Sequence, residues 1–175
     1  MQALVIIDVQ QGMFGGPAGE PYDGEGVVGR LASVLARARE THMPVFFVQH
    51  EGGAGSPLAK GTAGFDYHSA LTPFPSEDVT VKQHCSAFQS TDLHEKLIAA
   101  GVDHIVVGGM QTEFCVDTAV RGAFERGMGV SLISDGHTTF DTPALRAEQI
   151  VEHHNHTLSN GGFAELVAVA GVSFA

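Results

Sequence analysis

Short apolar runs alternate with segments of helical periodicity along almost the whole chain. Six runs have the length and composition of buried strands, at residues 3–7, 45–49, 79–81, 102–107, 130–134 and 167–170. Helices are expected between them, at about residues 27–41, 91–100, 115–126 and 143–158. Strands that alternate with helices run parallel, with crossovers that leave helices on both faces of the sheet. The sequence therefore predicts an α/β fold, a three-layer α/β/α sandwich with a mostly parallel, six-stranded sheet.

Length and charge narrow the class of protein further. With 175 residues the chain has the size of one domain, and we expect residues 1–175 to form it. Lys and Arg total 9 against 20 Asp and Glu, so the formal charge of -11 argues against nucleic acid as a partner. No apolar run approaches the length of a membrane span and no basic signal pattern is present, so a cytoplasmic protein without membrane contact is expected. Both cysteines, Cys85 and Cys115, are expected to be free thiols.

Reactive side chains follow three of the expected strands. Asp8 closes the first apolar run, Lys82 closes the third, and Cys115 follows the glycines that end the fourth. If these strands are parallel neighbours, an acid, an amine and a thiol meet at the edge of the sheet where α/β proteins bind ligands. A helix that starts at Cys115 would lower the pKa of the thiol and favour the thiolate. Taken singly, Cys115 could be an inert core cysteine, and Asp8 and Lys82 could face water.

Three sequence blocks occur in an order and spacing that is typical of one enzyme family. They are Val-Ile-Ile-Asp-Val-Gln at 5–10, Lys82 with the segments 86–88 and 91–93, and Gly-Met-Gln-Thr-Glu-Phe-Cys-Val at 109–116. Together they resemble the isochorismatase-like cysteine hydrolases, whose catalytic triad is Asp, Lys and Cys. The resemblance covers nearly the whole chain and implies a Rossmann-like fold.

The resemblance implies a role for each reactive residue. Asp8 would be the general base, Lys82 its charge partner and Cys115 the nucleophile. A non-proline cis peptide is implied between Met110 and Gln111. We expect the backbone N–H groups of Gln111 and Cys115 to form the oxyanion hole.

The implied activity is hydrolysis of a C–N bond in a small molecule. An amide, ureido or lactam carbonyl would be attacked by the thiol, and water would hydrolyse the resulting thioester. Two alternatives stay open: an isochorismatase-type vinyl-ether hydrolase, which needs an acid such as Asp8 but no thiol, and a catalytically silent binding or scaffold protein. Members of this family commonly assemble, so a homo-oligomer, a dimer or larger, is expected.

The segment from residue 50 to residue 78 is too long for an ordinary connection and is rich in Gly, Pro and Ser. Its apolar residues favour an ordered lid or an intersubunit arm over a simple surface excursion. Parts of it, at 57–58, 61–65 and His68, resemble the long loop of a subgroup that includes streptothricin hydrolase. The candidates for the wall of a substrate pocket, each of which could equally be core, are Phe14, His50, Phe65, Phe88 and Glu113.

Ten histidines raise the question of a metal, and the densest cluster is His153, His154 and His156. His153 and His156 would share a helix face, but no third ligand is evident, so we expect no metal or other cofactor. Nicotinamidases of the same family bind a metal through an Asp-x-His pair, where this chain has Gln49-His50-Glu51. Asp135 and His137 follow another strand and are expected to border the site structurally.

Overall fold

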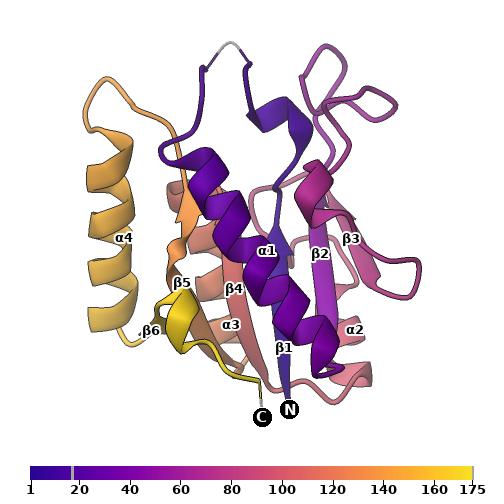
Figure 1. Ribbon diagram of the computed structural model, residues 1–175. Helices are drawn as coiled ribbons and strands as arrows, with labels where there is room; N and C mark the ends of the chain where they lie inside the picture. Colours follow the sequence, from indigo (N-terminus) through magenta and orange to yellow (C-terminus); the bar gives the residue numbers. More distant parts are fainter. Residues whose placement is uncertain (17, 175) are drawn as a thin grey trace.

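The computed structural model describes residues 1–16 and 18–174 and contains one six-stranded sheet (Figure 1). All of its strands are parallel, and their order across the sheet is β3-β2-β1-β4-β5-β6. The strands are β1 Gln2–Ile7, β2 Val45–His50, β3 Asp78–Lys82, β4 His104–Met110, β5 Gly129–Thr138 and β6 Glu165–Val167. The chain reverses its direction of growth across the sheet between β3 and β4. In parallel sheets, the strand ends beside such a reversal form the usual ligand crevice.

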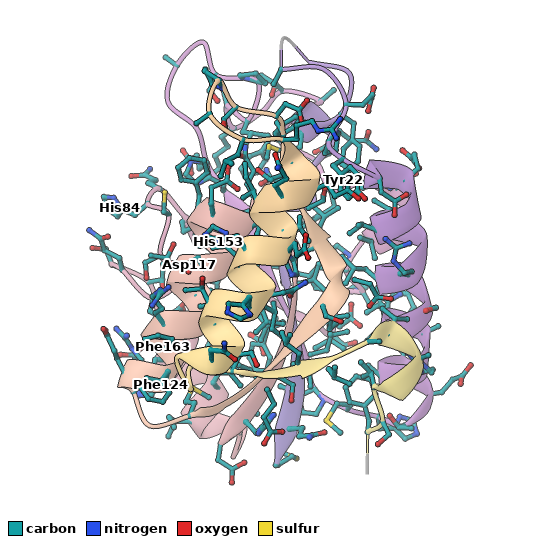
Figure 2. All side chains as sticks on the ribbon, turned by 90° about the vertical axis from the view of Figure 1, so that its left-hand side faces the viewer. Tyr22, His84, Asp117, Phe124, His153 and Phe163 are labelled. Atoms are coloured by element: carbon teal, nitrogen blue, oxygen red, sulfur yellow. The ribbon has the colours of Figure 1, made fainter. Side chains whose placement is uncertain are left out.

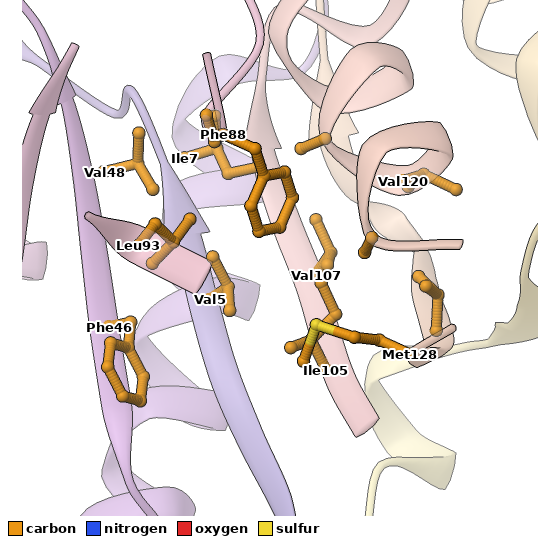
Figure 3. Close-up of a cluster of buried hydrophobic side chains, with 14 of the residues drawn as sticks. Val5, Ile7, Phe46, Val48, Phe88, Leu93, Ile105, Val107, Val120 and Met128 are labelled. Atoms are coloured by element: carbon orange, nitrogen blue, oxygen red, sulfur yellow. The ribbon is translucent and has the colours of Figure 1, made fainter. Parts of the chain in front are cut away.

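Helices cover both faces of the sheet. They are α1 Gly24–Glu40, α2 Leu93–Ala99, α3 Asp117–Glu125 and α4 Ala147–Asn160. Alternate residues of β1 point to opposite faces, so Leu4 and Ile6 pack under α1, while Val5 and Ile7 pack toward α2 and α3 (Figure 3). The predicted three-layer sandwich is therefore confirmed, with a separate apolar core on each side of the sheet.

Several predicted boundaries are wrong, and most of the differences lie at strand ends near the crevice. β4 continues to Met110 and β5 continues to Thr138, because the two strands resume pairing beyond an irregularity between Val107 and Gly109. The last strand is earlier than expected, and residues predicted to extend it form a 3₁₀ helix, Val169–Gly171.

The predicted starts of all four helices also differ from the observed ones, and two of the differences bear on the crevice. α4 begins at Ala147 rather than at Pro143, since the Asp141 carboxylate accepts a hydrogen bond from the Ala147 N–H at 2.8 Å and fixes the entry to the helix. The helix expected to start at Cys115 is preceded by a short π-helix, Thr112–Val116, so Cys115 lies inside a turn that leads into α3. Among the residues that the structure describes, no helix is long and apolar enough to cross a membrane.

Candidate active site

Asp8 lies where β1 leaves the sheet. Its backbone adopts a left-handed conformation, with φ of 51°, which turns the chain out of the strand direction. The Asp8 N–H still donates to the Val48 carbonyl at 3.0 Å, so the residue stays attached to β2. Its side chain is buried, with 2% exposure.

Lys82 is the last residue of β3, and this strand is not a neighbour of β1, so the condition of three adjacent strands is not met. β2 lies between them. The side chain is long enough to reach past β2, and its ammonium Nζ lies 2.6 Å from Asp8 Oδ2 in a pair that is sealed from solvent. The same ammonium donates to the His84 carbonyl at 3.0 Å. A buried ion pair of this kind leaves a costly single charge if either partner is removed.

Cys115 completes the cluster from the other side of β1. Its Sγ atom lies 3.2 Å from Lys82 Nζ, which donates to the sulfur. The structure therefore brings Asp8, Lys82 and Cys115 together at the carboxyl edge of the sheet, although they are up to 107 residues apart along the chain.

The expected low pKa of the thiol is wrong. Burial and the nearby Asp8 charge raise the pKa of Cys115 to about 12, and Lys82 offsets only part of this effect. Burial also raises the pKa of Asp8, against the attraction of Lys82. Burial opposes the charge of Lys82, but its attraction to Asp8 and Cys115 raises the pKa of that ammonium. The thiol of Cys115 is thus protonated at rest, beside the buried pair of Asp8 and Lys82.

The turn that carries Cys115 is held from its start. The peptide between Met110 and Gln111 is cis, as expected. The Gln111 carbonyl accepts hydrogen bonds from the N–H groups of Phe114 at 3.2 Å and Val116 at 3.1 Å. These bonds fix the backbone on both sides of the cysteine, while the oxyanion hole at Gln111 and Cys115 stays a prediction.

His50 is the pocket candidate that the structure places closest to the charged cluster. Its Nδ1 lies 3.3 Å from Lys82 Nζ. Burial and the neighbouring Lys82 lower the pKa of His50, so the ring is neutral near pH 7. Because an ammonium has only protons to donate, Nδ1 accepts from Lys82 and the ring proton resides on Nε2.

Sequence reasoning gave no role to Gln10, which is fully buried and links three parts of the chain. Its amide oxygen accepts from the His50 N–H at 2.9 Å. Its amide nitrogen donates to the His50 carbonyl at 3.0 Å and to the Phe65 carbonyl at 2.8 Å. Gln49 donates to the same Phe65 carbonyl at 2.7 Å. Its sequence signals were its position just beyond the first apolar run and its place at the end of the block at 5–10.

The long segment after β2 lies over the ends of β1 and β2 (Figure 1). The Phe65 carbonyl is its anchor on the two glutamines, and Gly12 N–H donates to the Gly64 carbonyl at 2.9 Å beside it. Between this segment and β3 are two open hollows of about 500 and 250 Å³. They share a polar lining of Glu51, Lys60 and Gln83; His50 borders the first and Lys82 the second.

The remaining pocket candidates have other neighbours. Phe14 lies against the His68 ring, with centroids 5.0 Å apart, and Phe88 is buried in the core near α3, with the Arg126 guanidinium over its ring. Neither residue borders the two hollows. Glu113 is half-buried in the turn before Cys115. Phe65 contributes its backbone carbonyl to the anchor described above.

The histidine cluster lies away from the charged cluster, on α4, where Figure 2 labels His153. His154 contacts the Ile150 carbonyl and His156 contacts Asn160, both within the same helix. Among residues 1–16 and 18–174, no group of three His, Cys, Asp or Glu side chains has an arrangement that could hold a metal ion.

Comparisons with known proteins agree with this geometry. The isochorismatase domain model matches residues 2–161. A streptothricin hydrolase of Streptomyces noursei is 37% identical over 82% of this chain and 52% of its own length, so the chain spans about half of that relative. A ureidoacrylate amidohydrolase, RutB of Methylobacterium radiotolerans, is 32% identical over 70% of this chain and 61% of its own. The crystal structure of an isochorismatase from Pseudomonas putida superposes with a TM-score of 0.91 at 27% identity, covering 98% of this chain and 90% of that one. The chain belongs to the isochorismatase family.

Proposed function

We propose that the protein hydrolyses a C–N bond of a small molecule, an amide, ureido or lactam bond, through a thioester on Cys115. The observation that carries this proposal is the position of Lys82, whose ammonium contacts both Asp8 Oδ2 at 2.6 Å and Cys115 Sγ at 3.2 Å. A thiol, a carboxylate and an ammonium in direct contact are the parts that nucleophilic catalysis by cysteine requires.

The proposed reaction begins with a proton transfer that accompanies attack. Because the pKa of the thiol is raised to about 12, little thiolate exists at rest, and Asp8 takes the proton as Sγ bonds to the carbonyl carbon. Lys82 holds the carboxylate in place and stabilises charge that develops on sulfur. The backbone N–H groups of Gln111 and Cys115 would bind the oxyanion.

The second half of the reaction releases both products. Asp8 returns the proton to the leaving nitrogen, and the C–N bond breaks to leave an acyl thioester. A water molecule then loses a proton to Asp8, attacks the thioester carbon and releases a carboxylic or carbamic acid, while the proton returns to Cys115.

The relatives support the bond class, and the hollows support the substrate size. One relative is named as an amidohydrolase of a ureido compound, and the other as a hydrolase of streptothricin. The two hollows beside His50 and Lys82 are small and mainly lined by polar residues, which favours a polar small molecule over a polymer.

The test is mass-spectrometric consumption of primary amides, ureido compounds, lactams and isochorismate by wild type, Cys115→Ala and Cys85→Ala. We expect Cys115→Ala to fold but to turn over nothing, while Cys85→Ala, which removes the exposed thiol, behaves as wild type. Full amide turnover by Cys115→Ala would refute the proposal.

A vinyl-ether hydrolase is the second candidate, favoured by one observation. Burial raises the pKa of Asp8, which favours the protonated carboxyl group that a general acid needs. Turnover of isochorismate that survives in Cys115→Ala would favour this reading, because protonation of an enol ether needs no thiol.

A further inference from the structure

A second polar cluster lies on the other side of β4 from Lys82, since Lys82 is on β3 and His137 is on β5. His137, near the end of β5, is buried with 2% exposure, and Thr112 is fully buried. Thr112 Oγ1 lies 2.9 Å from His137 Nδ1, and the Asn155 Oδ1 atom on α4 lies 3.0 Å from His137 Nε2. The Asn155 amide nitrogen donates to the Ser134 carbonyl at 2.9 Å, which orients the amide.

The hydrogen-bond directions follow from the partners. The Asn155 nitrogen is used on Ser134, so its oxygen faces His137 and accepts from Nε2–H. Burial lowers the pKa of His137 to about 4, so the ring is neutral at ordinary pH. A neutral ring with its proton on Nε2 has a lone pair on Nδ1, and the Thr112 hydroxyl therefore donates to it.

Thr112 connects this cluster to the candidate catalytic turn. It directly follows Gln111, the residue whose carbonyl binds the N–H groups of Phe114 and Val116 on either side of Cys115. No other side chain or backbone group is bound by the Thr112 hydroxyl among the hydrogen bonds of residues 1–16 and 18–174. The contact with His137 therefore fixes the side chain at the start of this turn.

We infer that Thr112, His137 and Asn155 are positioning residues that hold Gln111 and Cys115 in the geometry required for attack. The inference rests on the proposed function for its effect on turnover, but its effect on the thiol does not depend on any substrate. Displacements of about 1 Å in such a constellation cost up to about 100-fold in rate. Loss of the Thr112 hydroxyl should therefore act on kcat more than on KM.

The first test uses Thr112→Val and Thr112→Ser. Valine has nearly the shape of threonine but lacks the hydroxyl and leaves the buried Nδ1 without a donor. We expect Thr112→Val to lower kcat about 10- to 100-fold with KM nearly unchanged, and Thr112→Ser to recover most of the rate. The matched control is Thr157→Val, which removes a threonine–histidine contact of 3.4 Å with His153 on α4.

Alkylation by iodoacetamide gives a readout that needs no substrate. Peptide mass spectrometry reports Cys115 and Cys85 separately, and the exposed Cys85 serves as the internal reference. We expect Thr112→Val to slow alkylation of Cys115 about tenfold relative to Cys85, in proportion to its loss of kcat. An unchanged or faster rate at Cys115 would overturn the inference. Because this rate is independent of turnover, its result stands even if Cys115→Ala refutes the proposed function.

A second variant tests the role of the histidine through its protonation. Asn155→Asp keeps an acceptor for Nε2–H but places a carboxylate beside it, which favours the imidazolium; Asp135 already acts in this direction and His154 on α4 opposes it. An imidazolium cannot accept from Thr112. As pH is lowered, we expect the rate of Cys115 alkylation to fall at a higher pH in Asn155→Asp than in wild type. Asn160→Asp on the same helix should follow wild type. Coincident pH profiles for all three proteins would contradict the inference.

Discussion

The two sides of Cys115 are built on opposite electrostatic designs. On the side of β2 and β3, a carboxylate and an ammonium are buried together at 2.6 Å, next to a histidine and two polar hollows. On the side of β5 and α4, Thr112, His137 and Asn155 form a neutral chain of hydrogen bonds, in which Thr112 and His137 are buried and Asn155 is partly exposed. The charged groups lie where the proposed reaction transfers protons. The neutral hydrogen bonds lie where the proposed role is to hold the backbone in place.

This difference has an energetic consequence. Charges buried as a pair are expensive to separate, whereas neutral hydrogen bonds have a modest net value each. Mutations on the charged side should therefore cause large losses of stability and activity. On the neutral side, the stability should depend on pH.

The largest effect is expected for Lys82→Met. The substitution leaves the Asp8 carboxylate buried without its partner, which should cost about 3–5 kcal/mol of unfolding free energy and remove activity. Urea denaturation measures the loss. Lys96→Met is the surface control, since its pair with Asp92 at 3.2 Å is partly exposed and should contribute below about 1 kcal/mol. The double variant Asp8→Asn with Lys82→Met should recover most of the stability and none of the activity. If the stability did not recover, the loss in Lys82→Met would not come from an unpaired charge on Asp8.

The next effect is a pH dependence on the neutral side. The pKa of His137 is about 4 in the folded protein against 6.5 for a free histidine. The unfolded chain therefore binds the extra proton first, and stability should fall as pH falls from about 6.5 to 4, by about 3 kcal/mol in total.

His137→Gln should flatten this slope in chemical denaturation curves recorded across that pH range. His104→Gln serves as the control, because it removes a histidine–hydroxyl contact, 2.8 Å to Ser131, at the opposite end of the sheet. If the pH dependence of stability were unchanged in His137→Gln, it would arise from other groups.

A smaller effect is expected for His50→Ala. The variant removes an acceptor that lies 3.3 Å from the Lys82 ammonium, yet leaves the ion pair with Asp8 in place. We expect a fall in kcat of about tenfold, with a stability change of about 1 kcal/mol. Steady-state kinetics beside urea denaturation separate the two quantities. A loss of stability as large as that of Lys82→Met would show that the histidine belongs to the ion pair itself.

The smallest effect is expected for Cys85→Ser. This thiol is exposed and lies outside both clusters. Turnover should match that of wild type. The free energy of unfolding should lie within about 0.5 kcal/mol of the wild-type value, as for surface substitutions generally. A clear loss of turnover would show that Cys85 belongs to the functional site together with Lys82 and His84.

The sequence predicted which strand ends carry Asp8, Lys82 and Cys115, because apolar runs and the residues that close them are local signals. It did not predict that β2 separates β3 from β1, since strand order depends on contacts across the whole chain. The pairing of Thr112 with His137 depends on the irregular register between β4 and β5, which leaves no mark in either segment alone. The thiol pKa was misjudged because helix position is visible in a sequence, whereas burial beside a carboxylate is not.

The anchor of the long segment has a consequence for how members of this family can diversify. Gln10 and Gln49 hold the segment through the main-chain carbonyl of Phe65, not through any side chain of the segment. Side chains of this segment that border the hollows, such as Glu51, Ala54 and Lys60, can therefore be exchanged while the attachment to the sheet is kept. Gly64 cannot, because an added Cβ would lie 2.0 Å from the Pro57 carbonyl oxygen. A library restricted to the positions that border the hollows should yield variants that fold alike and differ in the molecules they accept.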